Sequence, residues 1–290
     1  MNAPERIKIS LNDGLMTGWH WPNSDKPRMV FAHANGFNAY TYHQMMTVLQ
    51  PEFDILAVDL RGHGLSQLPA DPSTHRSWNI YASDLVMMLS QLDRPADLLS
   101  GHSMGASSML LAAARLDTQI PLALIEPVVL PAFVYTMYYM PFGAALTSVG
   151  NSMSAQARRR NNSWPDRASV IDRYSERSPF RYWAKGVLED YLSDGLTEHG
   201  EDVQLSCDPM WEAANFEAQR NPVLAAASNV GSRAVVYRAE KASTVFNPTG
   251  LTSRGVRVES HEGLSHLAPM EAPRAMAHWI KTKWDEANAS

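Results

Sequence analysis

Short apolar runs alternate with helix-like stretches in the first 130 residues of the chain, and this alternation constrains the fold more than any other feature. The apolar runs lie at residues 29–34, 53–60, 97–103 and 122–129, and the helix-like stretches between them lie at 40–49, 78–92 and 104–116. The runs are continuous rather than apolar at every second residue, which is typical of strands that are buried on both faces. The sequence therefore predicts an α/β fold in which helices cover both faces of a parallel sheet.

The two ends of the chain extend this pattern, whereas its middle interrupts it. A turn signal at Asp13-Gly14 predicts a hairpin near the N-terminus. The alternation stops near Pro131, and it resumes with apolar runs at 234–240 and 256–262 and an amphipathic helix at 271–286. We therefore expect one discontinuous α/β domain with a helical insertion in which no strand is evident. The domain consists of residues 1–130 and 231–290, and the insertion of residues 131–230.

The composition limits the kinds of partner and cofactor. The 290 residues are 45% apolar, which is enough for a large core, and the net charge of −5 argues against a nucleic-acid partner. Cys207 is the single cysteine, so an internal disulfide is excluded and no zinc cluster is indicated. Because the sequence also has no phosphate-cradling glycine loop and no dinucleotide fingerprint, we predict that the protein uses no cofactor and no metal.

Two segments bear on where the protein resides. The N-terminal residues MNAPERIKIS are polar and lack the apolar stretch of a secretion signal, so we expect a cytoplasmic protein. Residues 131–150 are mostly apolar, but Pro141 and Gly143 interrupt them, and a membrane span needs about 20 continuous apolar residues. We expect a buried or groove-lining helix in this segment and no contact with a membrane.

The pentapeptide Gly101-His102-Ser103-Met104-Gly105 has the form G-x-S-x-G and stands between a predicted buried strand and a predicted helix. A serine on such a sharp strand-to-helix turn needs small neighbours. The N-terminus of the following helix offers free N–H groups beside the serine hydroxyl. This setting makes Ser103 the candidate nucleophile.

A serine hydroxyl is a weak nucleophile without a base, and the base must be chosen among ten histidines. His266 lies between the last predicted strand and the last predicted helix. In a parallel sheet this loop lies at the same edge as the Ser103 turn, so His266 is the candidate general base. His33, His63 and His102 precede or flank glycine-rich turns, where hydrogen bonding to the backbone is the expected role.

Four motifs make the chain similar to the α/β-hydrolase fold family, and the resemblance covers the whole predicted α/β core. They are HANGF (33–37), DLRGHG (59–64), GHSMG (101–105) and GLSHLAP (263–269). The resemblance implies a mostly parallel eight-stranded sheet, a helical cap inserted after strand six and a nucleophile–acid–histidine triad. It also implies an oxyanion hole formed by the backbone N–H groups of Asn35 and Met104, which leaves the Asn35 side chain free to contact substrate.

The acid of the triad departs from the commonest family pattern, which is G-E-x-D after strand seven. The matching residues are Ala239 to Ala242, and Ala242 stands where the aspartate is expected. A carboxylate is needed to hold the histidine in the right tautomer and to stabilise the imidazolium. Glu126, at the end of predicted strand six, is our candidate, because some haloalkane dehalogenases place their acid there and glutamate reaches further than aspartate. Glu240, Glu262 or the absence of an acid are the alternatives.

Other polar and aromatic residues have structural interpretations beside functional ones. The turn at 59–64 is expected to be held by ion pairs and backbone hydrogen bonds. The basic segment 158–185 and the acidic segment 186–219 are expected to neutralise each other in part. The alternative interpretation is that some of the arginines bind an anionic group of the substrate. The aromatic residues of the insertion are expected to form its core and, in part, to line a cleft over Ser103.

Three classes of function follow from these residues. The first is a serine hydrolase that cleaves small ester or thioester substrates through an acyl-enzyme intermediate. The second uses the same triad for hydrolysis of a C–C bond or for elimination. The third is a non-catalytic ligand-binding protein on a hydrolase scaffold, which the missing strand-seven aspartate leaves open. We expect a small-molecule substrate with an apolar acyl or aromatic group, because pockets under caps are mostly apolar. The sequence indicates neither the particular substrate nor the oligomeric state.

Overall fold

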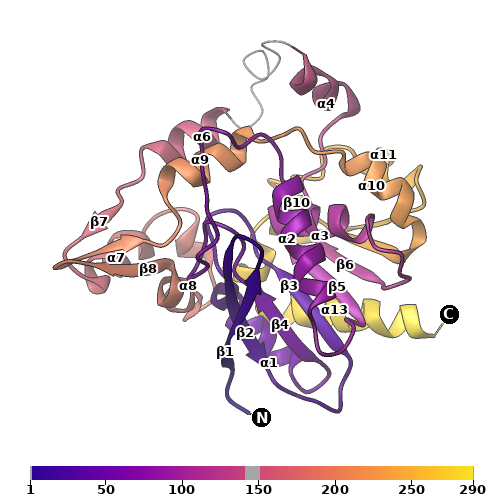
Figure 1. Ribbon diagram of the computed structural model, residues 1–290, viewed down its shortest axis with the longest axis horizontal. Helices are drawn as coiled ribbons and strands as arrows, with labels where there is room; N and C mark the ends of the chain where they lie inside the picture. The colour runs from indigo at the N-terminus through magenta and orange to yellow at the C-terminus, as the bar shows by residue number, and fades with distance from the viewer. Residues whose placement is uncertain (1, 141–150, 290) are drawn as a thin grey trace.

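A central eight-stranded sheet organises the computed structural model, which describes residues 2–140 and 151–289 (Figure 1). Its strands are β1 (Glu5–Leu11), β2 (Gly14–Trp21), β3 (Arg28–Ala32), β4 (Asp54–Val58), β5 (Leu98–His102), β6 (Leu122–Ile125), β10 (Ala234–Lys241) and β11 (Arg257–Ser265). They lie in the order β1-β2-β4-β3-β5-β6-β10-β11. Strand β2 pairs antiparallel with β1 and with β4, and the other pairs are parallel. The predicted α/β fold with a mostly parallel eight-stranded sheet is confirmed.

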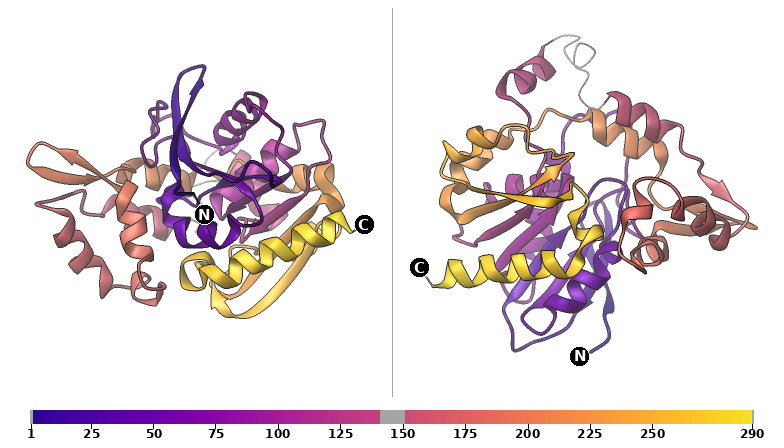
Figure 2. Two further views of the ribbon diagram at one scale, coloured as in Figure 1. Left: turned by 90° about the horizontal axis from the view of Figure 1, so that it is seen from below. Right: turned by 180° about the vertical axis from the view of Figure 1, so that it is seen from behind.

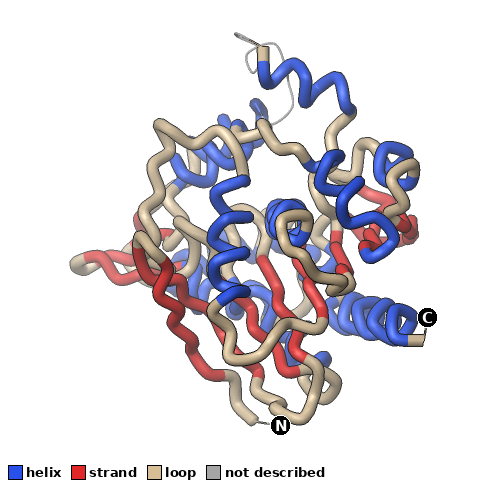
Figure 3. Tube along the Cα trace, turned by 45° about the vertical axis from the view of Figure 1, so that its right-hand side comes forward, coloured by secondary structure: helices blue, strands red, loops and turns tan. Residues whose placement is uncertain are grey.

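Successive residues of the central strands enter two different cores, one on each face of the sheet. In β3, Met29 and Phe31 point to one face and Val30 and Ala32 to the other, and all four are buried. The core on the side of Val30 includes α2 (Asn79–Ser90), α3 (Met104–Ala113) and α10 (Val223–Val230), and the core on the side of Phe31 includes α1 (His43–Leu49) and α13 (Pro273–Asn288). Figures 2 and 3 show helices on both sides of the sheet. Burial on both faces is the reason why the apolar runs are continuous.

The segment between β6 and β10 contains strands as well as helices, and our prediction of an insertion without strands is wrong. Its helices before α10 include α4 (Ala132–Tyr139), α6 (Asn151–Arg158), α7 (Arg167–Ser175), α8 (Val187–Gly195) and α9 (Pro209–Glu217). Strands β7 (Ser163–Trp164), β8 (Leu196–His199) and β9 (Asp202–Leu205) form a small antiparallel sheet in the order β7-β9-β8, which projects at the left of Figure 1. These strands have two or four residues each, too few to produce a recognisable apolar pattern.

Two further parts of this segment bear on the predictions. Helix α10 packs against α3, so its apolar side chains belong to the core of the main sheet. Helix α4 takes up the first part of the apolar segment 131–150, and residues 141–150 lie outside the described residues. None of the helices within residues 2–140 and 151–289 combines the length and the apolar character that a membrane crossing requires. The remaining short helices are η1 (Ala39–Tyr42), η2 (Phe180–Tyr182), η3 (Gly231–Arg233), α11 (Pro248–Thr252) and α12 (Ala268–Glu271).

The charged residues of this segment pair with one another in two places. Arg158 lies 2.9 Å from a carboxylate oxygen of Glu217, and Arg160 forms an ion pair with Glu212. Both pairs join α6, or the residues just after it, to α9, as we predicted for the basic and acidic segments. The aromatic side chains contribute to a core of the segment itself, in which Tyr174, Phe180, Trp183 and Tyr191 contact one another in a series of ring pairs.

Helix α8 attaches this segment to the first strands of the main sheet. Asp194 accepts two hydrogen bonds from Arg6, at 2.6 and 2.8 Å, and a third from the Trp19 indole at 2.7 Å. Asp190 lies on the same helix, and one of its carboxylate oxygens is buried without a hydrogen-bond partner among the described residues. Burial raises the pKa of Asp190 from 3.8 to about 6.

The raised pKa of Asp190 predicts a stability that depends on pH. The folded protein holds this proton more tightly than the unfolded chain does, so stability falls as pH rises from about 4 to about 6 and stays lower above that range. Asp190→Asn removes this loss and is expected to raise the free energy of unfolding by about 1–2 kcal/mol at pH 7.5 and by little at pH 4. Urea unfolding at both pH values measures the difference. Glu201→Gln, at an exposed acid outside the surroundings of Asp190, is the control, and a gain from Asp190→Asn that is equal at both pH values contradicts the prediction.

Candidate active site

Ser103 stands on a strained turn between β5 and α3. Its φ of 55° and ψ of −119° lie in a region that residues other than glycine seldom adopt. The turn requires glycine on both sides, because a Cβ at Gly105 would lie 2.3 Å from the Ala32 carbonyl oxygen and one at Gly101 would lie 2.9 Å from the Ala106 nitrogen. The G-x-S-x-G spacing therefore follows from the close approach of α3 to the sheet.

His266 lies in the loop between β11 and α12 and faces Ser103. Its Nε2 atom is 3.0 Å from the Ser103 hydroxyl oxygen. The loop is held at the backbone: the His266 N–H donates to the Lys241 carbonyl at 2.9 Å, and the His266 carbonyl lies 2.8 Å from Nε2 of His102. A carbonyl only accepts, so His102 carries its proton on Nε2, and its Nδ1 accepts from the Tyr42 hydroxyl at 2.8 Å. The expected backbone role of His102 is thus observed.

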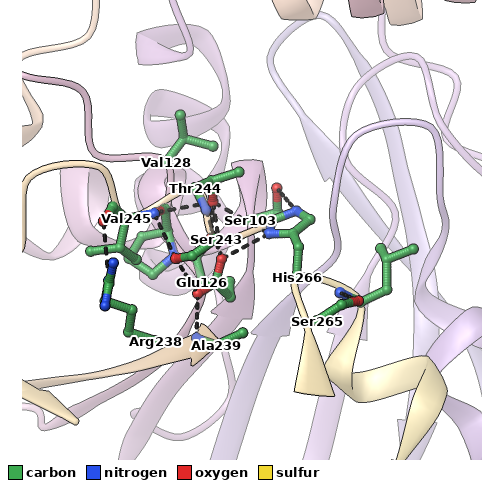
Figure 4. A network of polar contacts seen from close by, with 12 residues as sticks. Ser103, Glu126, Val128, Arg238, Ala239, Ser243, Thr244, Val245, Ser265 and His266 are labelled. Atoms are coloured by element: carbon green, nitrogen blue, oxygen red, sulfur yellow. Dashed lines mark hydrogen bonds and ion pairs between the residues drawn. The ribbon is translucent and has the colours of Figure 1, made fainter. Parts of the chain in front are cut away.

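Glu126 completes a chain of hydrogen bonds with these two residues (Figure 4). It follows β6 with a φ of 52°, it is fully buried, and its Oε2 atom lies 3.0 Å from Nδ1 of His266. The peptide N–H groups of Ala239 and Thr244 and the hydroxyl of Ser243 also donate to the carboxylate, at 2.6, 2.8 and 2.7 Å. Burial raises the pKa of Glu126, but the hydrogen bonds from His266 and the other donors outweigh this effect, so the pKa lies below its ordinary value. The carboxylate is therefore charged at neutral pH.

The loop after β10 holds Glu126 and supplies no acid of its own. Ala242, at the position of the usual aspartate, is exposed and has a φ of 52°. Of the alternative acids, Glu240 is exposed and accepts from the Gly263 N–H at 2.8 Å, and Glu262 is exposed as well. The side-chain partners of His266 Nδ1 among the described residues are Glu126 and Thr244, whose hydroxyl lies 3.3 Å away. The structure thus brings Glu126, and neither Glu240 nor Glu262, to the histidine.

The two backbone N–H groups that were expected to form an oxyanion hole lie at the start of α3 and in the turn after β3. Met104 is the first residue of α3, where helix N–H groups have no partner within the helix. Asn35 lies in a turn in which the Phe37 N–H donates to the Ala34 carbonyl at 3.2 Å and Gly36 has a φ of 76°. Neither the Asn35 N–H nor the Met104 N–H donates to an acceptor within the described part of the chain.

The side chain of Asn35 is not free, contrary to our expectation. Its amide donates to the Glu212 carbonyl at 3.0 Å and accepts from the Asn215 amide at 2.9 Å. Both partners lie on α9, which reaches this turn from the segment between β6 and β10. The amide is therefore occupied by the protein itself.

A match to a protein-family model shows to which family the chain belongs. The model of the alpha/beta hydrolase family matches residues 29–279. The chain belongs to the alpha/beta hydrolase family. It is also similar in sequence to 2-(acetamidomethylene)succinate hydrolase from Mesorhizobium japonicum, with 38% identity over 89 residues. That match spans 31% of this chain and 31% of the relative.

Solved structures support the fold of this alpha/beta hydrolase over its whole length. The chain is similar to E-2-(acetamidomethylene)succinate hydrolase, with a TM-score of 0.78 and 20% identity over 98% of this chain and 100% of the other. It is similar to the thioesterase domain from the curacin biosynthetic pathway, with a TM-score of 0.73 and 16% identity over 97% of this chain and 100% of the other. At these identities the likeness shows the fold alone.

The other residues for which we predicted a structural role form hydrogen bonds or ion pairs within the fold of this alpha/beta hydrolase. His33 contacts the Ala34 carbonyl through Nδ1 at 2.7 Å and accepts from the Leu60 N–H at 2.9 Å. His63 contacts the Arg61 carbonyl at 2.9 Å, and its other ring nitrogen lies 3.3 Å from the Asn35 side-chain oxygen. Burial lowers the pKa of His63 to about 4, so the ring is neutral. Arg61 forms ion pairs with two aspartates, and the 59–64 turn is thus held as predicted.

Sequence reasoning missed several residues that contact the candidate site. Ser243 and Thr244 hold Glu126, and Glu212 and Asn215 hold Asn35. The contact with Glu126 could have been inferred from the sequence, because the hydroxyl residues Ser243 and Thr244 directly follow Ala242 and hydroxyl groups suit a loop that binds a carboxylate. No group of three or more metal-binding side chains is assembled within the described residues.

Proposed function

We propose that the chain is a serine hydrolase of small ester or thioester substrates, with Ser103 as nucleophile, His266 as general base and Glu126 as the acid that orients the histidine. The observation that carries this proposal is the continuous hydrogen-bond chain Glu126–His266–Ser103, in which both contacts measure 3.0 Å. The lowered pKa of Glu126 supports it, because a charged carboxylate fixes the proton of His266 on Nδ1 and leaves Nε2 free to accept the serine proton.

In the proposed reaction the Ser103 oxygen attacks the substrate carbonyl while His266 Nε2 takes the hydroxyl proton. The negative charge that develops on the carbonyl oxygen is stabilised by the backbone N–H groups of Asn35 and Met104. The imidazolium then gives its proton to the leaving alcohol or thiol, and an acyl group stays on Ser103. Water, deprotonated by His266, attacks this acyl-enzyme and releases the carboxylic acid.

We further propose that the part of residues 131–230 that precedes α10 acts as a cap that selects a small substrate with an apolar acyl or aromatic group, because α10 belongs to the core of the main sheet. The contact of α9 with the Asn35 turn supports this role, because it brings the segment next to the proposed reaction centre. The sequence similarity to the 2-(acetamidomethylene)succinate hydrolase of Mesorhizobium japonicum favours a second candidate, in which the same triad acts on such an acylated amino dicarboxylate.

One set of measurements tests the proposed function. A fluorophosphonate probe is expected to label the wild-type chain at Ser103. p-Nitrophenyl esters of increasing acyl length are expected to be hydrolysed. A comparison with acyl thioesters, a dienone and 2-(acetamidomethylene)succinate shows which kind of bond the protein cleaves. Cleavage of the dienone alone favours C–C hydrolysis. Absence of both labelling and turnover overturns the proposal in favour of a ligand-binding protein.

A further inference from the structure

Helix α9 contacts the turn that carries the proposed oxyanion donor Asn35, and it does so through both backbone and side chains. The Glu212 carbonyl accepts from the Asn35 amide at 3.0 Å, and the Asn215 amide donates to the Asn35 side-chain oxygen at 2.9 Å. The Glu212 side chain also packs on Gly36, where an added Cβ would lie 2.9 Å from its carboxylate oxygen. The turn is therefore held by a helix that lies 177 to 180 residues further along the chain.

The partners of these amides fix which way each amide faces. The Glu212 carbonyl only accepts, so the NH₂ group of Asn35 must face it. The Asn35 oxygen then needs a donor, which Asn215 provides, and the Asn215 oxygen accepts from the Tyr81 hydroxyl of α2 at 2.6 Å. Asn215 is fully buried, and its bond with the Tyr81 hydroxyl is protected from competing water.

The N–H that we propose as an oxyanion donor belongs to the residue whose side chain α9 holds. The turn from Ala34 to Phe37 is short, so the anchored Asn35 side chain restricts the backbone conformations open to this residue. An N–H group stabilises an oxyanion only when it points at the position where the charge develops. Its direction is therefore set by contacts on α9 as well as by the turn.

We infer that Asn215 is a positioning residue for the oxyanion hole, acting through the side chain of Asn35, so that α9 links the segment between β6 and β10 to the proposed catalytic centre. This inference rests on the proposed function, because the oxyanion hole is part of it. Asn215 touches neither the substrate nor the reacting atoms in this assignment. Its loss should weaken stabilisation of the transition state and leave ground-state binding nearly unchanged.

Asn215→Asp tests the inference, because it keeps the shape of the side chain but places a carboxylate oxygen opposite the Asn35 oxygen. We expect kcat/KM for p-nitrophenyl acetate to fall about 10- to 100-fold through kcat, with KM nearly constant. The Ki of a trifluoromethyl ketone, which forms an oxyanion on Ser103, should rise by the same factor. Asn215→Ala gives a second variant that removes the donor without adding a charge.

Asn221→Ala is the matched control. Asn221 is equally buried and accepts from the Ser77 hydroxyl and the Trp78 N–H, but it does not contact Asn35. We expect this variant to lose stability as the Asn215 variants do, while its kcat/KM and Ki stay within about twofold of wild type. A structural effect of Asn215 alone would give the same kinetic profile in both sets of variants.

A double-mutant cycle with Asn35→Ala isolates the route of the effect. Because Asn35→Ala keeps the backbone N–H but removes the side chain, Asn215→Asp should change kcat/KM less than about twofold in that background. Losses that multiply fully in the double variant, or a rise in KM without a rise in Ki, overturn the inference alone. A wild-type chain without labelling and turnover overturns the proposed function, and the inference with it.

Discussion

Ser103→Ala is expected to abolish turnover, with kcat reduced at least about 10³-fold and by up to about 10⁶-fold if the triad acts as a unit. The hydroxyl supplies the bond-forming oxygen, and a methyl group at this position supplies none. The fold should persist, because alanine and serine carry the same Cβ at a φ of 55° and the Ser103 hydroxyl bonds to His266 among the described side chains. Initial rates on a p-nitrophenyl ester and the midpoint of thermal unfolding measure the two effects.

His266→Ala provides a second view of the same prediction. Its loss of turnover should be close to that of Ser103→Ala, and the double variant should be little worse than either single one, because the losses of triad members do not add. His261→Gln is the control, since His261 lies on β11 five residues earlier and contacts Tyr237 rather than the serine. A Ser103→Ala variant that keeps more than a few per cent of wild-type activity removes Ser103 from its proposed role.

The parts of this structure that sequence reasoning reached are those that local pattern and chain order determine. Continuous apolar runs identified the buried strands because residues such as Val30 and Phe31 enter opposite cores. Chain order and the rule that parallel strands end at one edge were enough to bring His266 to Ser103. Glu126 was predicted from the resemblance to haloalkane dehalogenases that place their acid at the end of strand six. The structure gives the physical reason, because β6 lies next to β10 and the Glu126 N–H donates to the Tyr237 carbonyl at the end of that pairing.

The parts that sequence reasoning missed depend on contacts between distant segments. The bond between Asn215 and Asn35 joins residues 180 positions apart, and no local pattern indicates it. The β8–β9 hairpin was missed because strands of four residues are too short to show a recognisable alternation of apolar and polar side chains. These strands are instead stabilised by packing of Leu196, Val203 and Leu205 against the aromatic core.

Glu126→Gln is expected to reduce kcat by about 10²- to 10⁴-fold, and the surroundings of the carboxylate give the reason. One oxygen of Glu126 accepts from Ala239 and Ser243, and the other accepts from Thr244 and His266. A glutamine amide has one oxygen, so its NH₂ group must face donors on one side or the other. Facing His266, it favours the wrong imidazole tautomer; facing Ala239, it meets a buried peptide N–H.

Either orientation also destabilises the fold, by about 1–3 kcal/mol, because a buried donor is left without an acceptor. The carboxylate's stabilisation is present above its ordinary pKa of 4.5 and is lost as pH falls through the lowered folded value. The stability difference between wild type and Glu126→Gln should therefore shrink in acid.

Glu240→Gln is the matched control and should keep both activity and stability, since Glu240 is exposed and bonds only to Gly263 among the described residues. Rates on one ester at pH 7 to 8 and urea unfolding at pH 4 and 7.5 measure these effects. Near-normal turnover in Glu126→Gln beside a large loss in Glu240→Gln would contradict the prediction and assign the role of the triad acid to Glu240.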